Sequence, residues 1–240
     1  MHQVPGDRAW QDGALAARLA GMPYTKRREE ARLGRWTAKN AVARALGLAP
    51  TAEVLQQIVI SNAADGAPEV SVAGAPLDAV IAMTDRADWA VCAVLGGGAR
   101  IGCDLELVEP RSAAFVRDYF TPGEQRCITS SADPHATANL LWSAKESALK
   151  VLRTGLRRDT RTVEVHLEAG AEGDWRALSV ADRDRPGFPG WWLRSGSFLL
   201  TVVAEEPFNP PRCLQRPAPL LSAQPGHSWL QNPYTPQQPA

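Results

Sequence analysis

Residues 101–107 are the most constraining stretch of this sequence, because their side chains alternate strictly in character. Positions 101, 103, 105 and 107 are apolar, whereas the opposite face carries Gly102, Asp104 and Glu106. This period of two predicts a β-strand. The two carboxylates project side by side, with Cα atoms about 6.6 Å apart, so both can reach one small cation. The glycine is expected to leave room for a bulky anion.

Taken alone, an Asp-x-Glu pair on a strand is a weak signal. Antiparallel strands commonly present one polar face to solvent, and acidic side chains are rarely buried. The surface interpretation is therefore favoured until a second segment supports a site.

That second segment is a predicted helix over residues 137–152. Trp142, Glu146 and Lys150 fall on one line at i, i+4 and i+8, away from the apolar face. The alternative is a solvent-exposed Glu–Lys pair, which contributes only about 0.3–0.5 kcal/mol. Against it, the chain has only four lysines and this helix holds two of them, so a compact ammonium group is expected to be needed here.

The remaining patterns predict an α+β protein built from two similar halves that meet near residues 105–112. Helices are predicted at residues 25–46, 113–120, 122–130 and 137–152, with Gly47 ending the first and a Thr121-Pro122-Gly123-Glu124 capping box opening the third. Strands are predicted at residues 54–60, 80–83, 89–95, 101–108, 163–167, 175–180, 191–194 and 198–203. A glycine turn at 96–98 is expected to join 89–95 to 101–108 as a hairpin.

These elements divide the chain into an N-terminal half (1–106), a C-terminal half (107–206) and a tail (207–240). Nine of the nineteen prolines fall in the tail, and its apolar residues lose their periodicity. We therefore expect residues 207–240 to be disordered.

Composition excludes several function classes. Twenty-six basic residues balance twenty-six acidic ones, which gives no reason to expect a nucleic-acid partner. No membrane-length apolar segment or signal pattern occurs, so a cytoplasmic protein is expected. The four cysteines lack metal-site spacing, and neither a Gly-x-Ser-x-Gly motif nor a P-loop is present.

Three segments together carry a more specific signal. In chain order they are Gly102-Cys103-Asp104-Leu105-Glu106, Phe120-Thr121-Pro122-Gly123-Glu124 and Trp142-Ser143-Ala144-Lys145-Glu146-Ser147-Ala148-Leu149-Lys150. Their order and spacing resemble the signature of the 4'-phosphopantetheinyl transferases of the surfactin-synthetase-activating type. The resemblance covers roughly residues 20–205 and is strongest over 89–155.

Members of that family move phosphopantetheine from coenzyme A to a serine of an acyl or peptidyl carrier protein and release adenosine 3',5'-bisphosphate. The resemblance implies the same activity here, on carriers of polyketide or nonribosomal peptide synthesis. The duplicated two-half length indicates a monomer.

The resemblance implies that Asp104, Glu106 and Glu146 bind a magnesium ion that also holds the coenzyme A pyrophosphate. Three hard carboxylate oxygens suit Mg²⁺. Lys150 is then the cation on the pyrophosphate. Either Glu146 or Glu124, acting through water, accepts the proton of the serine, and the sequence leaves this choice open because Glu124 also fits a capping box.

The coenzyme A site is expected to include a basic stripe on the first helix, because family members place basic residues in this region. The candidates are Lys26, Arg28, Arg32, Arg35 and, at the end of the stripe, Lys39. A solvated helix face is the alternative for each single residue.

Two usual coenzyme A contacts of the family are absent. Gly66-Ala67-Pro68 stands where Gly-Lys-Pro is common, and Ala82-Met83-Thr84 stands where Ser-His-Ser or a close variant is common, which leaves Thr84 as the polar candidate there. These departures motivate an alternative function, that of a carrier-protein or nucleotide-binding regulator without transferase activity. A third interpretation treats the acids as surface charge.

Overall fold

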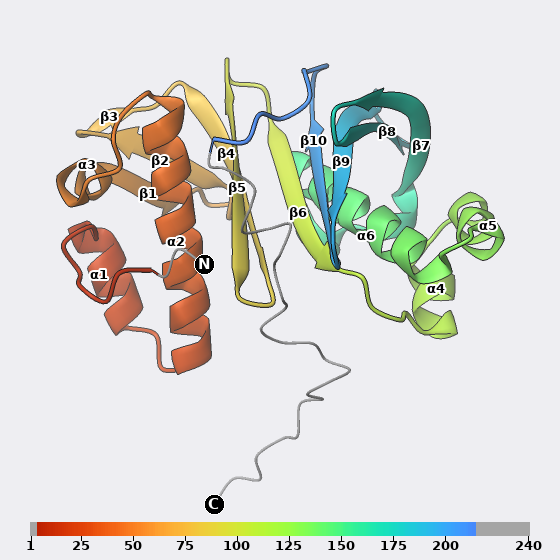
Figure 1. Ribbon diagram of the computed structural model, residues 1–240, viewed down its shortest axis with the longest axis horizontal. Coiled ribbons are helices and arrows are strands. Elements are labelled where there is room, and N and C mark those ends of the chain that lie inside the picture. Colours follow the sequence, from red (N-terminus) through yellow and green to blue (C-terminus); the bar gives the residue numbers. More distant parts are fainter. Residues whose placement is uncertain (1–3, 215–240) are drawn as a thin grey trace, which may run out of the picture.

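The structure, a computed structural model, describes residues 4–214 and has two halves that each contain one long helix packed on antiparallel strands. In Figure 1, helix α2 stands beside strand β5 in the left half and α6 lies beside β6 in the right half. The predicted α+β class is confirmed. No helix among residues 4–214 is long and apolar enough to cross a membrane.

The N-terminal half packs three helices around short strands. The helices are α1 (Gly13–Ala20), α2 (Thr25–Ala45) and α3 (Ala52–Gln57), and the strands are β1 (Ile58–Asn62), β2 (Pro68–Val72), β3 (Ala75–Pro76), β4 (Ala79–Arg86) and β5 (Trp89–Gly96). Helix α2 ends as predicted, with Gly47 at a φ of 71°.

Residues 54–57 were predicted to start a strand, and that prediction was wrong. They belong to α3, whose first turn is capped by Thr51, which accepts a hydrogen bond from the backbone N–H of Val54. The cap outweighs the β-propensity of the apolar residues that follow, because it satisfies an otherwise unpaired donor of the first turn.

The predicted hairpin between 89–95 and 101–108 was also wrong. Strand β5 pairs instead with β4, and the two are joined by Ala87 and Asp88, with φ values of 50° and 65°. Two successive residues with positive φ form the turn that best matches the twist of a hairpin, although neither is the glycine or asparagine that usually signals it. The glycines at 96–98 connect strands of different sheets.

The C-terminal half is one antiparallel sheet covered by helices. Its elements are β6 (Ile101–Leu107), α4 (Ala113–Tyr119), α5 (Pro122–Ser130), α6 (Pro134–Val151), two short 3-10 turns, η1 (Gly155–Arg157) and η2 (Thr160–Thr162), and β7 (Val163–Glu172), β8 (Trp175–Asp182), β9 (Phe188–Ser195) and β10 (Phe198–Ala204). The strand order is β6-β10-β9-β8-β7, so the last strand inserts beside the first. The predicted antiparallel succession of β7 to β10 is confirmed.

The two halves meet where β4 lies along β6. The backbone N–H of Leu105 donates to the Thr84 hydroxyl at 3.2 Å, and the Cys103 thiol donates to the Ala82 carbonyl at 3.3 Å. Buried Ala82, Ile101, Cys103 and Val202 form an apolar cluster across this junction. The acid-bearing strand is thus part of the seam between the halves.

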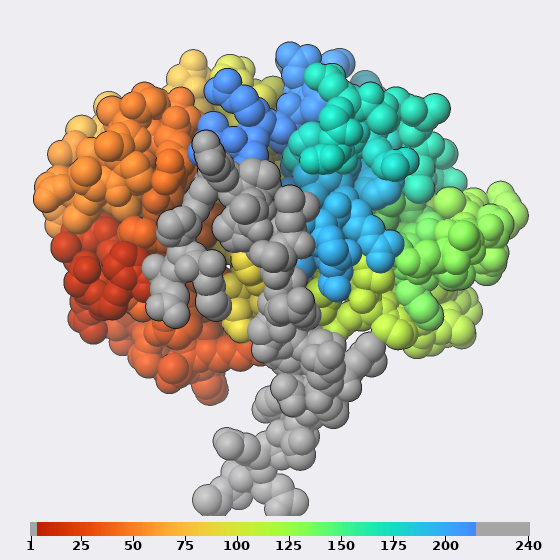
Figure 2. Space-filling model, viewed as in Figure 1, coloured from red at the N-terminus to blue at the C-terminus, as the bar shows by residue number. Residues whose placement is uncertain are grey.

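The described chain continues past the predicted boundary at residue 206. The indole N–H of Trp191 donates to the carbonyl of Phe208 at 3.0 Å, and Phe208 packs against the junction cluster. Figure 2 shows this last described stretch, in blue, at the surface between the two halves. The prediction of disorder over 207–240 was therefore wrong at Phe208, and its part over 215–240 lies outside the described residues.

Candidate functional site

Gly102 sets how closely α6 approaches β6. A Cβ atom at this position would overlap the backbone carbonyl of Ser147 and touch the Cβ of Lys150. The space beside the acids is therefore filled by the helix, and the expectation that Gly102 leaves room for an anion was wrong. Its role is to let α6 pack so closely that Glu146 and Lys150 come beside Asp104.

Asp104 is the most buried of the three predicted ligands. Its Oδ1 accepts hydrogen bonds from Lys150 Nζ at 3.0 Å and from the Thr84 hydroxyl at 3.1 Å. Its Oδ2 is buried and has no hydrogen-bond partner among the described residues. A buried carboxylate oxygen without a donor is costly, and a bound cation would compensate that cost.

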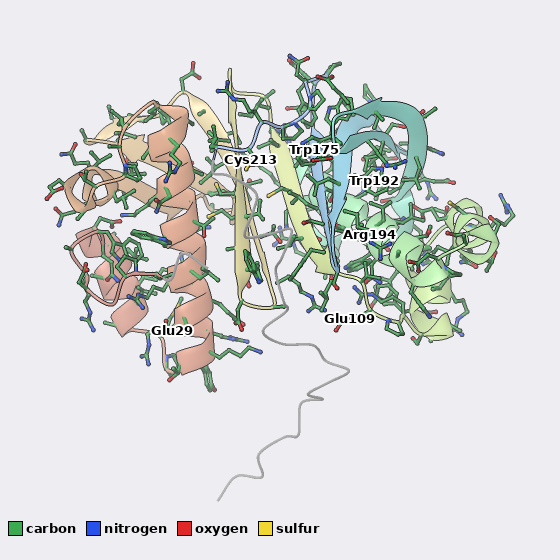
Figure 3. All side chains as sticks on the ribbon, viewed as in Figure 1. Glu29, Glu109, Trp175, Trp192, Arg194 and Cys213 are labelled. Atoms are coloured by element: carbon green, nitrogen blue, oxygen red, sulfur yellow. The ribbon has the colours of Figure 1, made fainter. Side chains whose placement is uncertain are left out.

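Glu106 projects beside Asp104 but is held by two arginines that the sequence did not point out. Its Oε2 lies 3.2 Å from Arg111 Nη2 and 3.4 Å from Arg86 Nε. Burial and repulsion by Asp104 raise the pKa of Glu106 to about 7, although both arginines act in the opposite direction. Arg86 also pairs with Glu109, which Figure 3 labels near the chain that follows β6.

Glu146 completes the acidic set from α6. Burial raises its pKa, with a further contribution from Asp104, while Lys150 partly offsets both. Repulsion among these carboxylates means that they share one electrostatic environment, as the metal hypothesis requires. Across residues 4–214, however, no three His, Cys, Asp or Glu side chains lie close enough to hold a metal ion in their present rotamers.

Lys150 bridges helix and strand instead of forming the local pair with Glu146 considered from the sequence. Its Nζ donates to Asp104 and to the carbonyl of Cys103 at 2.7 Å. Burial acts to lower the pKa of Lys150, but Asp104 outweighs it and the net shift is upward. The side chain is 32% exposed, so its charge remains accessible to an anion.

Glu124 occupies a closed environment. The predicted capping box is present, because Thr121 N–H donates to Glu124 Oε2 at 2.8 Å and the Thr121 hydroxyl accepts from Glu124 N–H. Its Oε1 accepts from Val165 N–H at 2.9 Å, and Lys145 Nζ lies 2.8 Å from Oε2. Both carboxylate oxygens of Glu124 are hydrogen-bonded and only 1% of the residue is exposed, so its contacts are those of a structural residue.

Lys145, five residues before Lys150 in the same helix, lies in the core. It is fully buried and also donates to the carbonyls of Thr160 and Val163 at 2.8 and 2.6 Å. The Glu124–Lys145 pair thereby ties α5, α6 and β7 together.

A cavity of about 640 Å³ opens at the junction of the halves, next to Lys150. Its wall brings together the two segments that depart from the family pattern, so Ala67 and Met83 face the same space. Basic residues at the end of α6 and near β6 line it too, namely Arg100, Lys150, Arg153 and Arg157. Only the tertiary structure shows that these residues share one cavity.

The basic stripe of α2 is not a row of exposed cations. Lys26 lies 4.0 Å from Glu30, and Arg28 donates to the Met22 carbonyl and the Thr25 hydroxyl. Lys26 and Arg28 do not line the cavity. Their contacts are those of an exposed helix end.

Farther along α2, the basic side chains turn inward. Arg32 pairs with Glu29, labelled in Figure 3, and Arg35 is buried, with Nη2 donating to Asn62 Oδ1 at 2.7 Å. Lys39 is fully buried and lies 2.7 Å from Asp12. The contacts of Arg35 and Lys39 therefore belong to the packing of the N-terminal half.

Comparisons with known proteins find similarity over part of the chain. Residues 100–187 match the family model described as the 4'-phosphopantetheinyl transferase superfamily. The matched segment is less than half of the chain. It contains Asp104, Glu106, Glu146 and Lys150, so the resemblance predicted from the motifs is confirmed at the level of the superfamily.

Two proteins are similar over part of the chain. A holo-[acyl-carrier-protein] synthase of Chlamydia muridarum (strain MoPn / Nigg) is 33% identical over 58 residues, which are 24% of this chain and 46% of that protein. The chain thus spans about half the length of this curated relative. The crystal structure of the holo-[acyl-carrier-protein] synthase from Neisseria meningitidis aligns with a TM-score of 0.38 and 18% identity, over 45% of this chain and 98% of that one.

Proposed function

We propose that this protein transfers the 4'-phosphopantetheine group from coenzyme A to a serine of an apo acyl or peptidyl carrier protein and releases adenosine 3',5'-bisphosphate. The observation that carries the proposal is the contact of α6 with β6. Across this contact Lys150 is hydrogen-bonded to Asp104, and Glu146 is electrostatically coupled to Asp104 and Glu106, beside a basic cavity that Lys150 lines. Carriers of polyketide or nonribosomal peptide synthesis remain the predicted partners.

The chemistry of the donor set suits a magnesium ion, although the three carboxylates do not converge closely enough to hold one in the arrangement described for residues 4–214. Asp104 offers a buried, unpartnered carboxylate oxygen, and the coupled acids Glu106 and Glu146 supply the further hard oxygens that Mg²⁺ prefers. When bound, the ion would neutralise charge on the pyrophosphate. Lys150 would add a second positive charge beside the same phosphates.

The reaction balances with the residues present. The serine oxygen forms a bond to the β-phosphorus, and the bond from that phosphorus to the bridging oxygen breaks, so that adenosine 3',5'-bisphosphate leaves. The serine proton goes to a carboxylate. We assign this role to Glu146, because both oxygens of Glu124 are already hydrogen-bonded within the fold.

A regulator that binds nucleotide without transfer is the second candidate. The residues of the cavity wall favour this candidate, since Ala67 and Met83 offer no charge to a phosphate. Such a protein would bind coenzyme A but leave every carrier in its apo form.

The decisive experiment follows the mass of purified apo carrier proteins incubated with this protein, coenzyme A and magnesium. Transfer adds about 340 Da, the mass of the phosphopantetheine group. We expect this increment on at least one carrier and its loss when a chelator removes divalent cations. Absence of the increment on a panel of acyl and peptidyl carriers, under conditions where coenzyme A binds, would favour the regulator.

A cytoplasmic monomer is the expected state of the protein. The junction of β4 and β6 lets one chain enclose the cavity from both halves. Light scattering after size exclusion tests this expectation directly.

A further inference from the structure

We infer that Arg153 and Arg157, at the end of α6, form a phosphate subsite that binds the 3'-phosphate of the nucleotide. This inference rests on the proposed function, because it assigns one end of the coenzyme A molecule to a wall of the cavity. Nothing in the motif segments predicts it, since both arginines follow the last motif residue, Lys150.

The charge of the cavity wall is the first reason. Four basic side chains line it, Arg100, Lys150, Arg153 and Arg157, and Asp65 is the only acidic residue among the lining residues. The protein as a whole has no net charge, so this concentration of positive charge is local. Such a wall favours a ligand with several negative charges.

The part of the cavity wall that comes from the N-terminal half, residues 62–68 and 80–83, carries no cation, which is the second reason. Ala67 and Met83 replace the lysine and histidine that the family pattern would supply. Arg35, the nearest arginine of α2, donates to Asn62 and contacts the sulfur of Met83 at 3.8 Å. The cations left at the cavity wall are those at the end of α6 and at Arg100.

Arg153 occupies a backbone conformation that disfavours its own side chain. Its φ is 58°, and it follows the C-cap of α6, where the left-handed conformation is usually taken by glycine. The N–H of Thr154 closes this helix end by donating to Leu149 O at 3.2 Å. An arginine at a position that favours glycine points to a use for its guanidinium group.

The contacts of these arginines leave them available to a ligand. Arg153 has only a surface pair with Asp65 at 3.3 Å, with both side chains more than a third exposed. Arg157 is exposed and has no hydrogen bond or ion pair within residues 4–214. Between them, the Thr154 hydroxyl is buried without a partner in that part of the chain and lines the same cavity.

Lys150 and Arg153 then serve different phosphates of one molecule. Lys150 is bound to Asp104 and belongs to the acidic set, where the pyrophosphate reacts. Arg153 and Arg157 follow it in the chain and line the cavity, whereas Asp104, Glu106 and Glu146 are not among the lining residues. The subsite would therefore fix the adenosine end while the reaction takes place at the other.

Calorimetric titration of the full-length protein with adenosine 3',5'-bisphosphate and with adenosine 5'-monophosphate tests the subsite without any turnover. We expect the bisphosphate to bind at least about tenfold more tightly, since a charge-assisted hydrogen bond is worth about that factor. R153Q/R157Q should bind both ligands equally. The charge-matched control R44Q/R126Q, at exposed positions outside the cavity, should keep the preference.

R153G separates binding from folding. Glycine suits the left-handed position, so the melting temperature should stay equal or rise while affinity for the bisphosphate falls. A full preference for the bisphosphate in both R153G and R153Q/R157Q would overturn the subsite.

Transfer assays with coenzyme A and 3'-dephospho-coenzyme A distinguish the two proposals. If both substrates support transfer and R153Q/R157Q raises KM only for coenzyme A, both proposals hold. If transfer occurs but R153Q/R157Q leaves the ratio of the two KM values unchanged, the subsite is overturned and the transferase stands. If no transfer occurs but the bisphosphate preference depends on Arg153 and Arg157, the transferase fails and the subsite stands.

Discussion

Gly102 of β6 lies directly against the backbone of Ser147 of α6, with no space for a side chain between them. This contact fixes the distance between the strand that carries two of the acids and the helix that carries the third.

Substitution of Gly102 by alanine should push the helix away from the strand. We expect a loss of about 1–3 kcal/mol in the free energy of unfolding, as for other overpacked sites, together with a larger loss of transfer activity. Urea denaturation and the carrier assay measure the two effects. Gly34→Ala in α2 is the matched control, because its added Cβ meets no atom within 4 Å. Unchanged activity in Gly102→Ala would contradict the spacing argument.

Asp104→Asn should abolish transfer and weaken magnesium binding while the protein remains folded. The amide keeps the shape but removes the charge that the unpartnered Oδ2 offers to a cation. Calorimetric titration with magnesium and a thermal melt with and without the ion check this result. Asp78→Asn, at an exposed position, should behave like the wild type. Retained turnover in Asp104→Asn would remove this residue from the metal set.

Glu124→Gln distinguishes a structural from a catalytic glutamate. Gln offers one acceptor oxygen where two are used and leaves the buried Lys145 without its counter-charge, so we expect a destabilisation of about 3–5 kcal/mol with turnover per folded molecule retained. Lys145→Met should cost a similar amount, because it leaves a buried carboxylate without its counter-charge. A stable Glu124→Gln protein that has lost at least about 10²-fold in rate would instead identify Glu124 as the base.

Asp12 and Lys39 form a buried pair that should make stability depend on pH. Burial acts to raise the pKa of Asp12, but hydrogen bonds from Lys39 and Leu15 outweigh it, so the pKa in the folded protein is below the ordinary 3.8. Stability from this pair is therefore present above about pH 4 and is lost as the pH falls through the folded pKa.

Asp12→Asn is the matching variant, because asparagine caps α1 as well as aspartate does. At neutral pH it should destabilise the protein by about 3 kcal/mol or more, since Lys39 is left buried and unpaired. The stability gap to the wild type should close below about pH 4, as measured by urea denaturation across pH. A stability difference between the two proteins that is constant with pH would show that ionisation of Asp12 does not contribute to stability.

Phe208→Ala should loosen the junction between the halves. Phe208 is half-buried against the cluster that contains Ala82 and Ile101, so we expect a loss of about 1–2 kcal/mol in stability. Leu214→Ala, in the same segment but more exposed, should change stability much less. Equal melting temperatures for the two variants would mean that Phe208 contributes nothing to the junction.

Local patterns determined much of this protein. The period of two over residues 101–107, the capping box at Thr121 and the helical period of α6 each depend on residues that are near neighbours in the chain. They predicted the strand, the helices and the motif segments, and therefore the resemblance to the superfamily whose model matches residues 100–187. A motif whose residues all lie in one segment can be recognised without knowing which other segments contact it.

Only the tertiary structure shows which distant segments of the chain contact one another. Strand β6 pairs with β10 and lies along β4, and no local signal distinguishes this from a hairpin with β5. Lys145 and Lys150, five residues apart, differ because one side chain enters the core and the other reaches Asp104. Burial and long-range pairing depend on the whole packing arrangement, so the sequence indicated the acids of the site but not Arg86, Arg111, Arg153 or Arg157.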